Sequence, residues 1–353
     1  MSMKIAETSM TNRPPQNGPG ATPILDVRNL MVHFDLHDGR RVQAVDGVSF
    51  VLETGKTLGI VGESGSGKTT VVRAVLRIVD APGRIGGGQM FFRGEDLLGL
   101  SNEQMRHLRS RKIAMIFQNP AGSLDPLFTI GDQFVETIRT HSGLNRRQAV
   151  DRAKEALDLV GVANPATVME SFPTFFNAGM IQRIMIGMAI SCEPDVILAD
   201  EPTTTLGVLA QAQILNALIG IQDRLGTAVL LITHDMGVVA HVADDILVMY
   251  AGRCVEYGSK EQVLLNPQHP YTVGLMGSVP AIDQARTSRL STIPGFPPDL
   301  SALPPGCPFA PRCYRKPAIA EVVRPELVEV EPGHWVSCHS PVPAAERTPL
   351  AHG

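Results

Sequence analysis

The sequence predicts an α/β protein built around a mainly parallel sheet, and three observations support that prediction. Short apolar runs bounded by turn or polar residues recur along the chain, as expected for strands buried on both faces of a sheet. Helical patterns lie between these runs, and strands that alternate with helices favour parallel pairing. A glycine-rich segment directly follows one of the runs, at the edge where such sheets bind ligands.

The chain begins with a segment, residues 1–23, that is rich in Pro, Gly, Asn and Thr, and we expect it to form a disordered arm. From Ile24 the run to residue 34 alternates like a strand, and residues 42–52 fit its hairpin partner. This hairpin predicts a small antiparallel β subdomain ahead of the main sheet.

Four apolar runs are expected to supply the main sheet, although periodicity alone does not separate such runs from buried helix. They are Thr57–Val61, 112–117, 196–199 and 228–232. Helices are expected over residues 146–160 and 209–225. Residues 119–180 hold no convincing strand, which predicts an inserted helical subdomain.

The last part of the chain differs in amino-acid composition from the rest. Residues 280–345 are dense in proline, so we expect residues 266–353 to form a separate, loop-rich C-terminal extension. It would follow a main domain of residues 24–265. The total of 353 residues agrees with two domains at about 150 residues each.

The composition narrows the class of protein. A formal net charge of −4 argues against a broad basic face for nucleic acid. No stretch reaches the ~18 consecutive apolar residues of a membrane-spanning helix, and the first residues lack the apolar segment of a secretion signal. Five cysteines in 353 residues do not suggest a disulfide framework, so we expect a cytosolic location.

The most specific motif is a phosphate-binding loop of the pattern G-x-x-x-x-G-K-[ST]. It comprises Gly62, Glu63, Ser64, Gly65, Ser66, Gly67, Lys68, Thr69 and the adjacent Thr70. Glycines let successive N–H groups converge on phosphate oxygens, and the following helix directs its positive end at them. Lys68 is expected to bind the β- and γ-phosphates and Thr69 to bind Mg²⁺. The alternative, a glycine-rich turn with an incidental lysine, does not account for the flanking strand and helix.

Two carboxylates follow the apolar run at 196–199. Asp200 is the expected partner of Mg²⁺, and Glu201, on the other side of the strand end, is the candidate general base. Alone, this pattern is weak evidence because many strands end in acidic turns. Together with the phosphate-binding loop it predicts a site that binds and hydrolyses a nucleoside triphosphate.

Gln118 and His234 each end an apolar run and therefore fall at the same predicted sheet edge as Asp200. We expect both to act near the γ-phosphate, with Gln118 also a ligand of Mg²⁺. A glutamine or a histidine taken singly is more often a surface or capping residue. The shared placement of the two side chains favours the catalytic interpretation.

The order of these motifs resembles that of an ABC-type ATPase subunit: phosphate-binding loop, Gln118, helical insertion, signature helix, Asp200-Glu201, then His234. The resemblance covers residues 24–265. It implies a P-loop NTPase fold with an antiparallel β subdomain and an inserted helical subdomain. It also implies ATP and Mg²⁺ as cofactors.

The extension resembles that of the peptide/nickel importer branch of this family. The similar segments are NPQHPYTVGLMGSVP at 266–280, GCPFAPRC at 306–313 and GHWVSCH at 333–339. The resemblance implies a peripheral protein at the cytoplasmic face of the inner membrane, whose ATPase activity drives import of peptides or related small solutes. The implied partners are a second ABC ATPase, two membrane-spanning permease subunits and an extracytoplasmic solute-binding protein, with no nucleic acid.

The signature of the family, L-S-G-G-x-x-Q, caps the nucleotide held by the opposite subunit, and here it is altered. Asn177 and Ala178 replace the serine and the first glycine, whereas Gly179 and Gln182 remain. We expect the Ala178 side chain to hinder the close approach to the γ-phosphate if this position needs a positive φ.

A second departure lies at Thr205-Leu206-Gly207, where the family has Ser/Ala-Leu-Asp. In a head-to-tail pair each site combines the phosphate-binding loop of one chain with the signature of the other. We therefore expect an asymmetric heterodimer in which the site on this chain's own loop is efficient and the other is slow. The alternatives are that the changes are tolerated, that the subunit has decayed, or that it is a nucleotide-binding regulatory or assembly subunit with negligible hydrolysis. The extension argues against a soluble ABC protein that acts on ribosomes or DNA.

Three cysteines of the extension, Cys307, Cys313 and Cys338, resemble part of a four-cysteine element for an iron–sulfur cluster in this branch. Ala320 stands where the third cysteine belongs, and such clusters prefer four ligands. An apolar clasp or unpaired thiols are therefore expected more than a cluster.

In this family an aromatic ring upstream of the phosphate-binding loop usually holds adenine. Phe34 is the candidate for this contact in the present chain. The alternative, that Phe34 packs in the core, is given equal weight.

Overall fold

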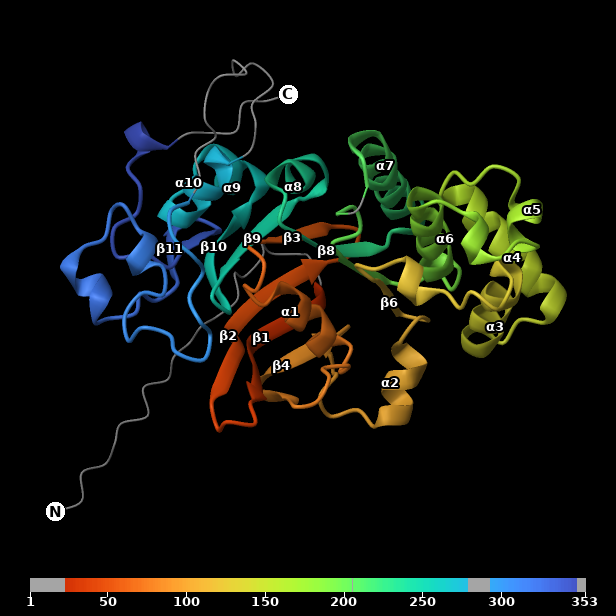
Figure 1. Ribbon diagram of the computed structural model, residues 1–353, viewed down its shortest axis with the longest axis horizontal. Coiled ribbons are helices and arrows are strands. Elements are labelled where there is room, and N and C mark those ends of the chain that lie inside the picture. Colours follow the sequence, from red (N-terminus) through yellow and green to blue (C-terminus); the bar gives the residue numbers. More distant parts are fainter. Residues whose placement is uncertain (1–22, 205, 279–292, 348–353) are drawn as a thin grey trace.

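The computed structural model describes residues 23–204, 206–278 and 293–347 (Figure 1). The predicted arm lies outside these residues apart from Pro23, as does Thr205 of the altered segment after Glu201. The described chain forms a four-stranded and an eight-stranded sheet. In these three ranges no helix combines the length and the apolarity that crossing a bilayer requires.

The four-stranded sheet is antiparallel, with the order β2-β1-β4-β5. Its strands are β1 (Pro23–Asp35), β2 (Arg41–Glu53), β4 (Gly83–Phe92) and β5 (Glu95–Asp96). The predicted hairpin is confirmed, with Phe34 opposite Val42. The sequence does not predict β4, because the glycines at 86–88 interrupt its pattern and glycine is a weak strand former. Its pairing along β1 compensates for that weak local preference.

The eight-stranded sheet has the order β11-β12-β10-β9-β3-β8-β7-β6. Its strands are β3 (Thr57–Val61), β6 (Ile113–Ile116), β7 (Val196–Asp200), β8 (Ala228–Thr233), β9 (Asp245–Tyr250), β10 (Arg253–Ser259), β11 (Val328–Glu331) and β12 (His334–Val336). The four predicted runs are confirmed as β3, β6, β7 and β8, which pair in parallel. β9 also pairs with β3 in parallel, and the strands beyond β9 are antiparallel.

The helices of the described chain lie between and around these strands. They are α1 (Lys68–Val75), α2 (Asn102–Leu108), α3 (Ile130–Ser142), α4 (Arg146–Leu159), α5 (Pro165–Met169), α6 (Ala178–Ile190), α7 (Val208–Leu225), α8 (Met236–Val242), α9 (Lys260–Leu265) and α10 (Pro270–Gly277). The two helices predicted over residues 146–160 and 209–225 are confirmed as α4 and α7.

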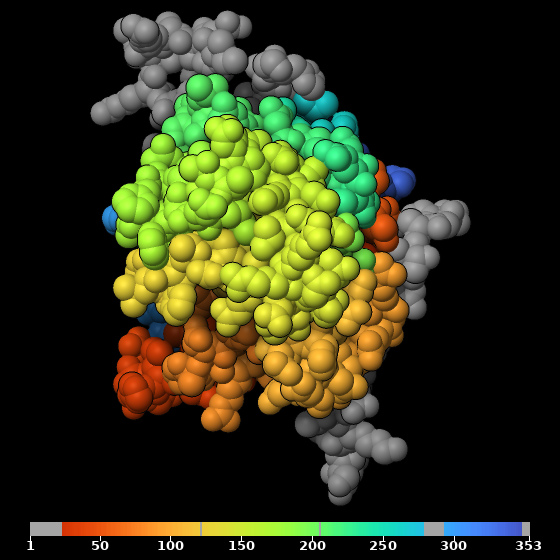
Figure 2. Space-filling model, turned by 90° about the vertical axis from the view of Figure 1, so that its right-hand side faces the viewer, coloured from red at the N-terminus to blue at the C-terminus, as the bar shows by residue number. Residues whose placement is uncertain are grey.

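The segment of residues 119–180 contains helices and no strand, as predicted. Its helices gather with α6 at one end of the molecule, and Figure 2 shows them covering the face at that end. Asn145 starts α4 in a capping box, because its side chain accepts the N–H of Gln148 and the Gln148 side chain accepts the N–H of Asn145. Phe134 and Leu157 are fully buried in a core that also includes Ile197 of β7. This core fixes the helical segment to the large sheet.

Helix α1 is buried beside both sheets. Val71 and Val75 on α1 belong to one core with Phe50 of β2 and Leu230 of β8. Each fully buried side chain of this kind contributes roughly 1.5–3 kcal/mol. The start of α1, and with it the phosphate-binding loop, is therefore held firmly against the carboxyl end of β3.

The C-terminal extension packs against the main domain, and the expectation that it is separate is wrong. Strands β11 and β12 extend the large sheet, because β12 pairs with β10. Tyr271 of α10 and Phe309 share a core with Tyr250 of β9. Figure 1 shows this part, coloured blue, against the end of the sheet opposite the helical segment.

Candidate nucleotide site

The phosphate-binding loop connects β3 to α1. Gly62 and Gly67 have φ values of 156° and 101°. A Cβ on these residues would lie 2.2 Å from the Met249 carbonyl oxygen and 2.1 Å from the Ala44 carbonyl oxygen, respectively. Both positions therefore require glycine, for conformation and for space. The tip of the loop, at residues 64–65, is exposed to solvent.

Lys68, the first residue of α1, is buried beneath this loop. Its Nζ donates hydrogen bonds to the carbonyl oxygens of Gly62 (2.7 Å) and Glu63 (2.9 Å). Burial lowers the pKa of Lys68, and the carboxylates of Glu201 and Asp200 oppose that shift. The helix offers no side-chain cap to its first-turn amides, because its N-cap is Gly67. An ammonium group and helix-terminal amides at one place suit a polyphosphate.

Thr69 and Asp200 meet at the same sheet edge. The Thr69 hydroxyl donates to the Asp200 carboxylate over 2.9 Å. Burial raises the pKa of Asp200, and the hydrogen bond from Thr69 partly offsets the shift. A hydroxyl and a carboxylate side by side are the hard oxygen donors that Mg²⁺ prefers, so these two predicted ligands fit that ion.

Glu201 has the side chain on which the other predicted catalytic residues converge. Its Oε2 accepts hydrogen bonds from the Gln118 amide (3.1 Å) and the Thr204 hydroxyl (2.9 Å), and His234 Nδ1 lies 3.5 Å away. The strands that end beside these residues are neighbours, in the order β8-β7-β6. The side chains of Gln118 and His234 are exposed, so the group faces solvent beside the loop.

The backbone of Glu201 is strained. Its φ is 47°, in the left-handed region that non-glycine residues rarely adopt, while its N–H donates to the Ile232 carbonyl over 2.9 Å. This conformation turns the chain sharply after β7 and directs the side chain toward Gln118. Sequence reasoning did not single out Thr204, although its position three residues after Glu201 is a signal for such a turn contact.

Similarity to known proteins agrees with this geometry. The family profile described as ABC transporter matches residues 45–204, and that of the C-terminal region of oligopeptide/dipeptide transporters matches residues 255–319. A probable peptide ABC transporter ATP-binding protein of Sinorhizobium fredii is 44% identical over 324 residues, covering 92% of this chain and 96% of that relative. The chain belongs to the ABC transporter ATP-binding proteins.

Two further relatives extend the comparison. The dipeptide transport ATP-binding protein of Bacillus subtilis is 44% identical and covers 89% of this chain and 94% of its own length. The oligopeptide transport ATP-binding protein of Haemophilus influenzae is 43% identical, and the match covers 90% of this chain and 97% of that relative. The predicted place in the oligopeptide and dipeptide branch of the ABC family is confirmed by these relatives and by the match of the extension.

Solved ABC cassettes have the same fold. The dimeric cassette MJ0796 superimposes with a TM-score of 0.60 at 23% identity, covering 67% of this chain and 98% of that one. For cbiO1 of Clostridium perfringens the TM-score is 0.59 at 24% identity, and the match covers 69% of this chain and 91% of cbiO1. The predicted ABC ATPase fold is confirmed, and membership of the family confirms an ABC-type ATPase that uses ATP and Mg²⁺.

The altered signature of this ABC protein lies at the start of α6. Asn177 is the N-cap, and its Oδ1 accepts the N–H of Met180 over 2.9 Å. Ala178 lies in the first helical turn and outside the left-handed region, so the positive φ on which the expected hindrance depends is not present. An asparagine retains the helix cap that a serine would provide. Compared with glycine, Ala178 adds a methyl group to the exposed surface at the start of α6.

The last signature residue, Gln182, is buried with 2% of its surface exposed, and its Nε2 has no hydrogen-bond partner within the described chain. Gly179 has room for a side chain, since an added Cβ would lie 3.6 Å from the nearest atom. In the segment after Glu201, Gly207 is the N-cap of α7 with a φ of −71°, and Thr205 lies outside the described residues.

The three cysteines of the extension line one small cavity together with Ala320 and His339, with a volume of about 20 Å³, enough for roughly one water. Burial raises the pKa of Cys338 to about 11, which keeps the thiol protonated. In the described ranges no group of three His, Cys, Asp or Glu residues is arranged to hold a metal ion. The residues present do not fit a four-thiolate cluster, and the alternative of an iron–sulfur cluster is not supported.

Phe34 is half-buried and packs against the core beneath β1 and β2. This placement gives it a structural role, and contact with adenine stays a prediction.

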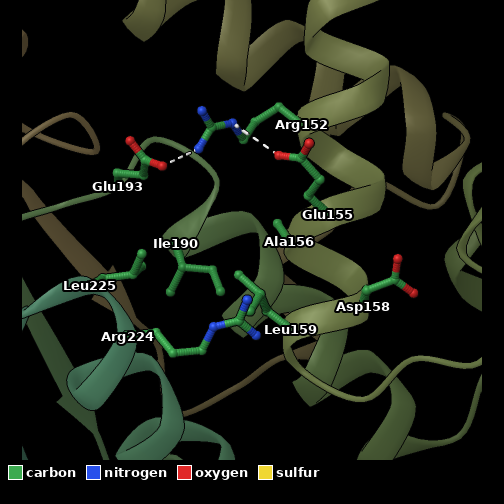
Figure 3. A pocket seen from close by; sticks show the side chains of 9 residues that line it. All are labelled: Arg152, Glu155, Ala156, Asp158, Leu159, Ile190, Glu193, Arg224 and Leu225. Carbon is green, nitrogen blue, oxygen red and sulfur yellow. Dashed lines mark hydrogen bonds and ion pairs between the residues drawn. The ribbon is translucent and has the colours of Figure 1, made fainter.

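A larger cavity of about 450 Å³ lies away from the nucleotide site (Figure 3). Arg152 of α4 reaches across it to Glu193 and also faces Glu155, while Arg224 lies on the opposite side. None of the residues that line it is a predicted site residue.

Proposed function

We propose that this chain is the ATP-hydrolysing subunit of a membrane importer for peptides or related small solutes. The observation that carries the proposal is the convergence of Gln118 and His234 on Glu201, next to the pair of Thr69 and Asp200. This arrangement would supply two ligands for Mg²⁺, a base and a contact for the γ-phosphate at one sheet edge. The relatives, named as peptide transport ATP-binding proteins, supply the solute class.

The proposed assembly contains a second ABC ATPase, two membrane-spanning permease subunits and an extracytoplasmic solute-binding protein. This chain would lie as a peripheral protein at the cytoplasmic face of the inner membrane. ATP held between the two ATPases favours the closed pair, because the open pair lacks the contacts at the γ-phosphate. Hydrolysis at Glu201 would then reopen it.

The surface proposed to contact the permease follows Gln118 in the sequence. Leu127 and Phe128, in the loop before α3, are 80% and 55% exposed. Large exposed apolar side chains at one place are typical of interaction surfaces. Motion of this loop would be linked to the nucleotide through Gln118, which contacts Glu201.

The proposed pair is asymmetric. This chain retains Lys68, Asp200 and Glu201, so the site on its own phosphate-binding loop would be efficient with a partner whose signature is intact. The partner's loop would face Asn177 and Ala178. The methyl group of Ala178 would weaken closure there and make that site slow.

The test is the ATPase activity of the complex reconstituted in liposomes with the two permeases, the second ATPase and the binding protein. Peptide together with the binding protein should stimulate hydrolysis and drive uptake of labelled peptide. Uptake that continues without this chain would contradict the proposal. A control assembly with the Glu193→Gln subunit, changed at the cavity of Figure 3, should behave as the native assembly does.

The altered signature also favours a second candidate, a nucleotide-binding regulatory or assembly subunit with negligible hydrolysis. This candidate predicts that the reconstituted complex needs ATP bound to this chain but no hydrolysis there. Full transport with a Glu201→Gln subunit would support it and would exclude the first proposal.

A further inference from the structure

The extension reaches into the phosphate-binding loop through one buried arginine. Arg312 is 7% exposed, and its guanidinium donates to both carboxylate oxygens of Glu63, over 2.6 Å and 2.9 Å. The two residues are 249 positions apart in the sequence. Glu63 belongs to the loop motif GESGSGKT and Arg312 to the motif GCPFAPRC of the extension. A two-point contact of this kind fixes the geometry as well as the charge.

We propose that Arg312 is a positioning residue of the nucleotide site: the extension holds the phosphate-binding loop in its binding conformation through Glu63. The proposal rests on the proposed function, since it concerns how this chain binds ATP. It assigns to the extension a part in nucleotide binding in addition to its contribution to the core.

The extension holds the backbone of Glu63 as well as its side chain. The Glu63 N–H donates to the Tyr271 hydroxyl over 2.8 Å. On the other side of the same residue, the Glu63 carbonyl accepts the hydrogen bond from Lys68 Nζ over 2.9 Å. The position of Glu63 therefore helps to determine where the Lys68 ammonium lies. A displacement of Glu63 would move the charge that is meant to meet the phosphates.

Arg312 is itself held from several sides. Its Nε donates to the Pro294 carbonyl over 2.8 Å, and one terminal nitrogen lies 3.4 Å from the Tyr250 hydroxyl. The rings of Tyr250, Tyr271 and Phe309 pack against one another with centroid separations of 4.7–5.4 Å. The guanidinium is thus preorganised, so little side-chain entropy is lost when it pairs with Glu63.

The segment that carries Tyr271 is anchored to the large sheet through Glu256. The carboxylate of Glu256, fully buried on β10, accepts the N–H groups of Gln268 and His269 just before α10. It also lies 2.8 Å from Nε2 of His334 on β12. Tyr271 follows His269 by two residues, so it is fixed to the same network. The extension can therefore resist movement of the loop.

Charge gives the contact a second role. Without Arg312 a carboxylate would stand uncompensated at the second position of a loop that binds a triphosphate. Arg312 is buried and the Glu63 side chain is partly buried, so removing the arginine leaves a partly desolvated carboxylate without its partner. The unpaired carboxylate would both repel the nucleotide and pull on Lys68.

The experiment is calorimetry of MgATP binding to the full-length chain, supported by KM and kcat of the reconstituted complex. Arg312→Met should raise the dissociation constant about tenfold, as expected for loss of one charged hydrogen-bonding partner. KM should rise with it, while kcat should stay within about twofold, because no group that touches the reacting atoms changes. In Glu63→Gln/Arg312→Met the affinity should return to within about threefold of Glu63→Gln alone, since the unpaired carboxylate is gone.

Arg324→Met is the matched control. Arg324 also joins the extension to the main domain, through Asp46 of β2 at 3.3 Å, but it does not contact the loop. Its removal should leave the MgATP affinity unchanged. If Arg312→Met does not fold, Tyr271→Phe is the substitute, because it removes only the hydroxyl that holds the Glu63 N–H and should weaken binding about threefold.

Equal effects of Arg312→Met and Arg324→Met would overturn the proposal, because they would reflect a general loosening of the extension. Native affinity in a folded Arg312→Met chain, or no recovery in the double variant, would also overturn it. Failure of the native chain to bind MgATP would instead contradict the proposed function, so the two failures are distinguishable.

Discussion

The phosphate-binding edge and the signature helix of this chain differ in how far they depend on other molecules. At the phosphate-binding edge Lys68, Asp200 and Glu201 already contact their neighbours within one chain. At the start of α6 Asn177 caps its own helix, and Gln182 is buried. The first region therefore gathers the residues of the proposed site within one chain, whereas the second presents a surface that a partner ATPase would use in the proposed pair.

In the proposed asymmetric pair, this chain would keep its own site intact while its contribution to the partner's site is altered. Substitutions at 62–70 or 200–201 would alter the contacts on which this chain's own nucleotide depends. The replacements at 177 and 178 preserve the helix cap and a helical conformation, so they are compatible with folding. Their functional effect is expected only in the assembled pair.

The largest expected effect comes from Glu201→Gln in the assembled complex. Loss of a general base typically costs 10²–10⁴-fold, so turnover should fall by about 100-fold or more. The corresponding change in the second ATPase should have a far smaller effect if the pair is asymmetric. ATPase rates of the two singly substituted complexes measure this directly. Equal losses would show that both sites work and would contradict the asymmetry.

A smaller effect is expected for Lys68→Ala in the isolated chain. Loss of its charged hydrogen bonds to phosphate should weaken MgATP binding about 10–100-fold. Calorimetry gives the dissociation constant. Lys56→Ala is the control, because Lys56 pairs with Asp244 at the opposite edge of the sheet. A similar loss in both variants would mean that general loosening, and not the phosphate contact, is responsible.

The pH dependence of MgATP binding tests Asp200. Burial raises the pKa of this carboxyl, and only the ionised form binds Mg²⁺, so affinity should fall with decreasing pH at a higher pH than for an exposed aspartate. One competing proton limits the change to about tenfold per pH unit. When the metal is removed by chelation, ATP binding should no longer show the pH dependence that comes from Asp200. An identical profile with and without Mg²⁺ would assign the titration to another group.

The smallest effect is expected from restoring the signature with Asn177→Ser/Ala178→Gly. If the partner's site is slow because of these two residues, a second site becomes active and turnover of the complex should rise at most about twofold. MgATP affinity of the isolated chain should not change. A fall in turnover would show that the asparagine and the alanine serve the native cycle as they are.

Much of the fold and of this site followed from local patterns. The apolar run of β3, the glycine-rich loop and the start of α1 are consecutive in sequence, and their geometry follows from periodicity and from glycine. Gln118, Asp200 and His234 were predicted at one edge because each follows a parallel strand. β9 was not predicted, although its run of apolar residues is similar to that of β3 and indicates a buried strand by the same criterion.

Other features depend on partners far away in the sequence. β4 contains three consecutive glycines, which do not favour a strand. β11 and β12 contain Val and Trp, which do favour strands, but the two runs are only four and three residues long and lie in a proline-rich segment, so local sequence alone does not specify them. Each forms because another strand is positioned beside it. Burial of Gln182 and the small cavity around Ala320 are likewise results of packing.

The amino-acid sequence by itself determined the phosphate-binding loop, the carboxylates after β7 and the alternation of strands and helices, because these depend on residues within a few positions of one another. Only the tertiary structure decided that Arg312 meets Glu63 and that the extension joins the large sheet. Local sequence specifies conformation, whereas the choice of a partner 249 residues away depends on how the whole chain packs.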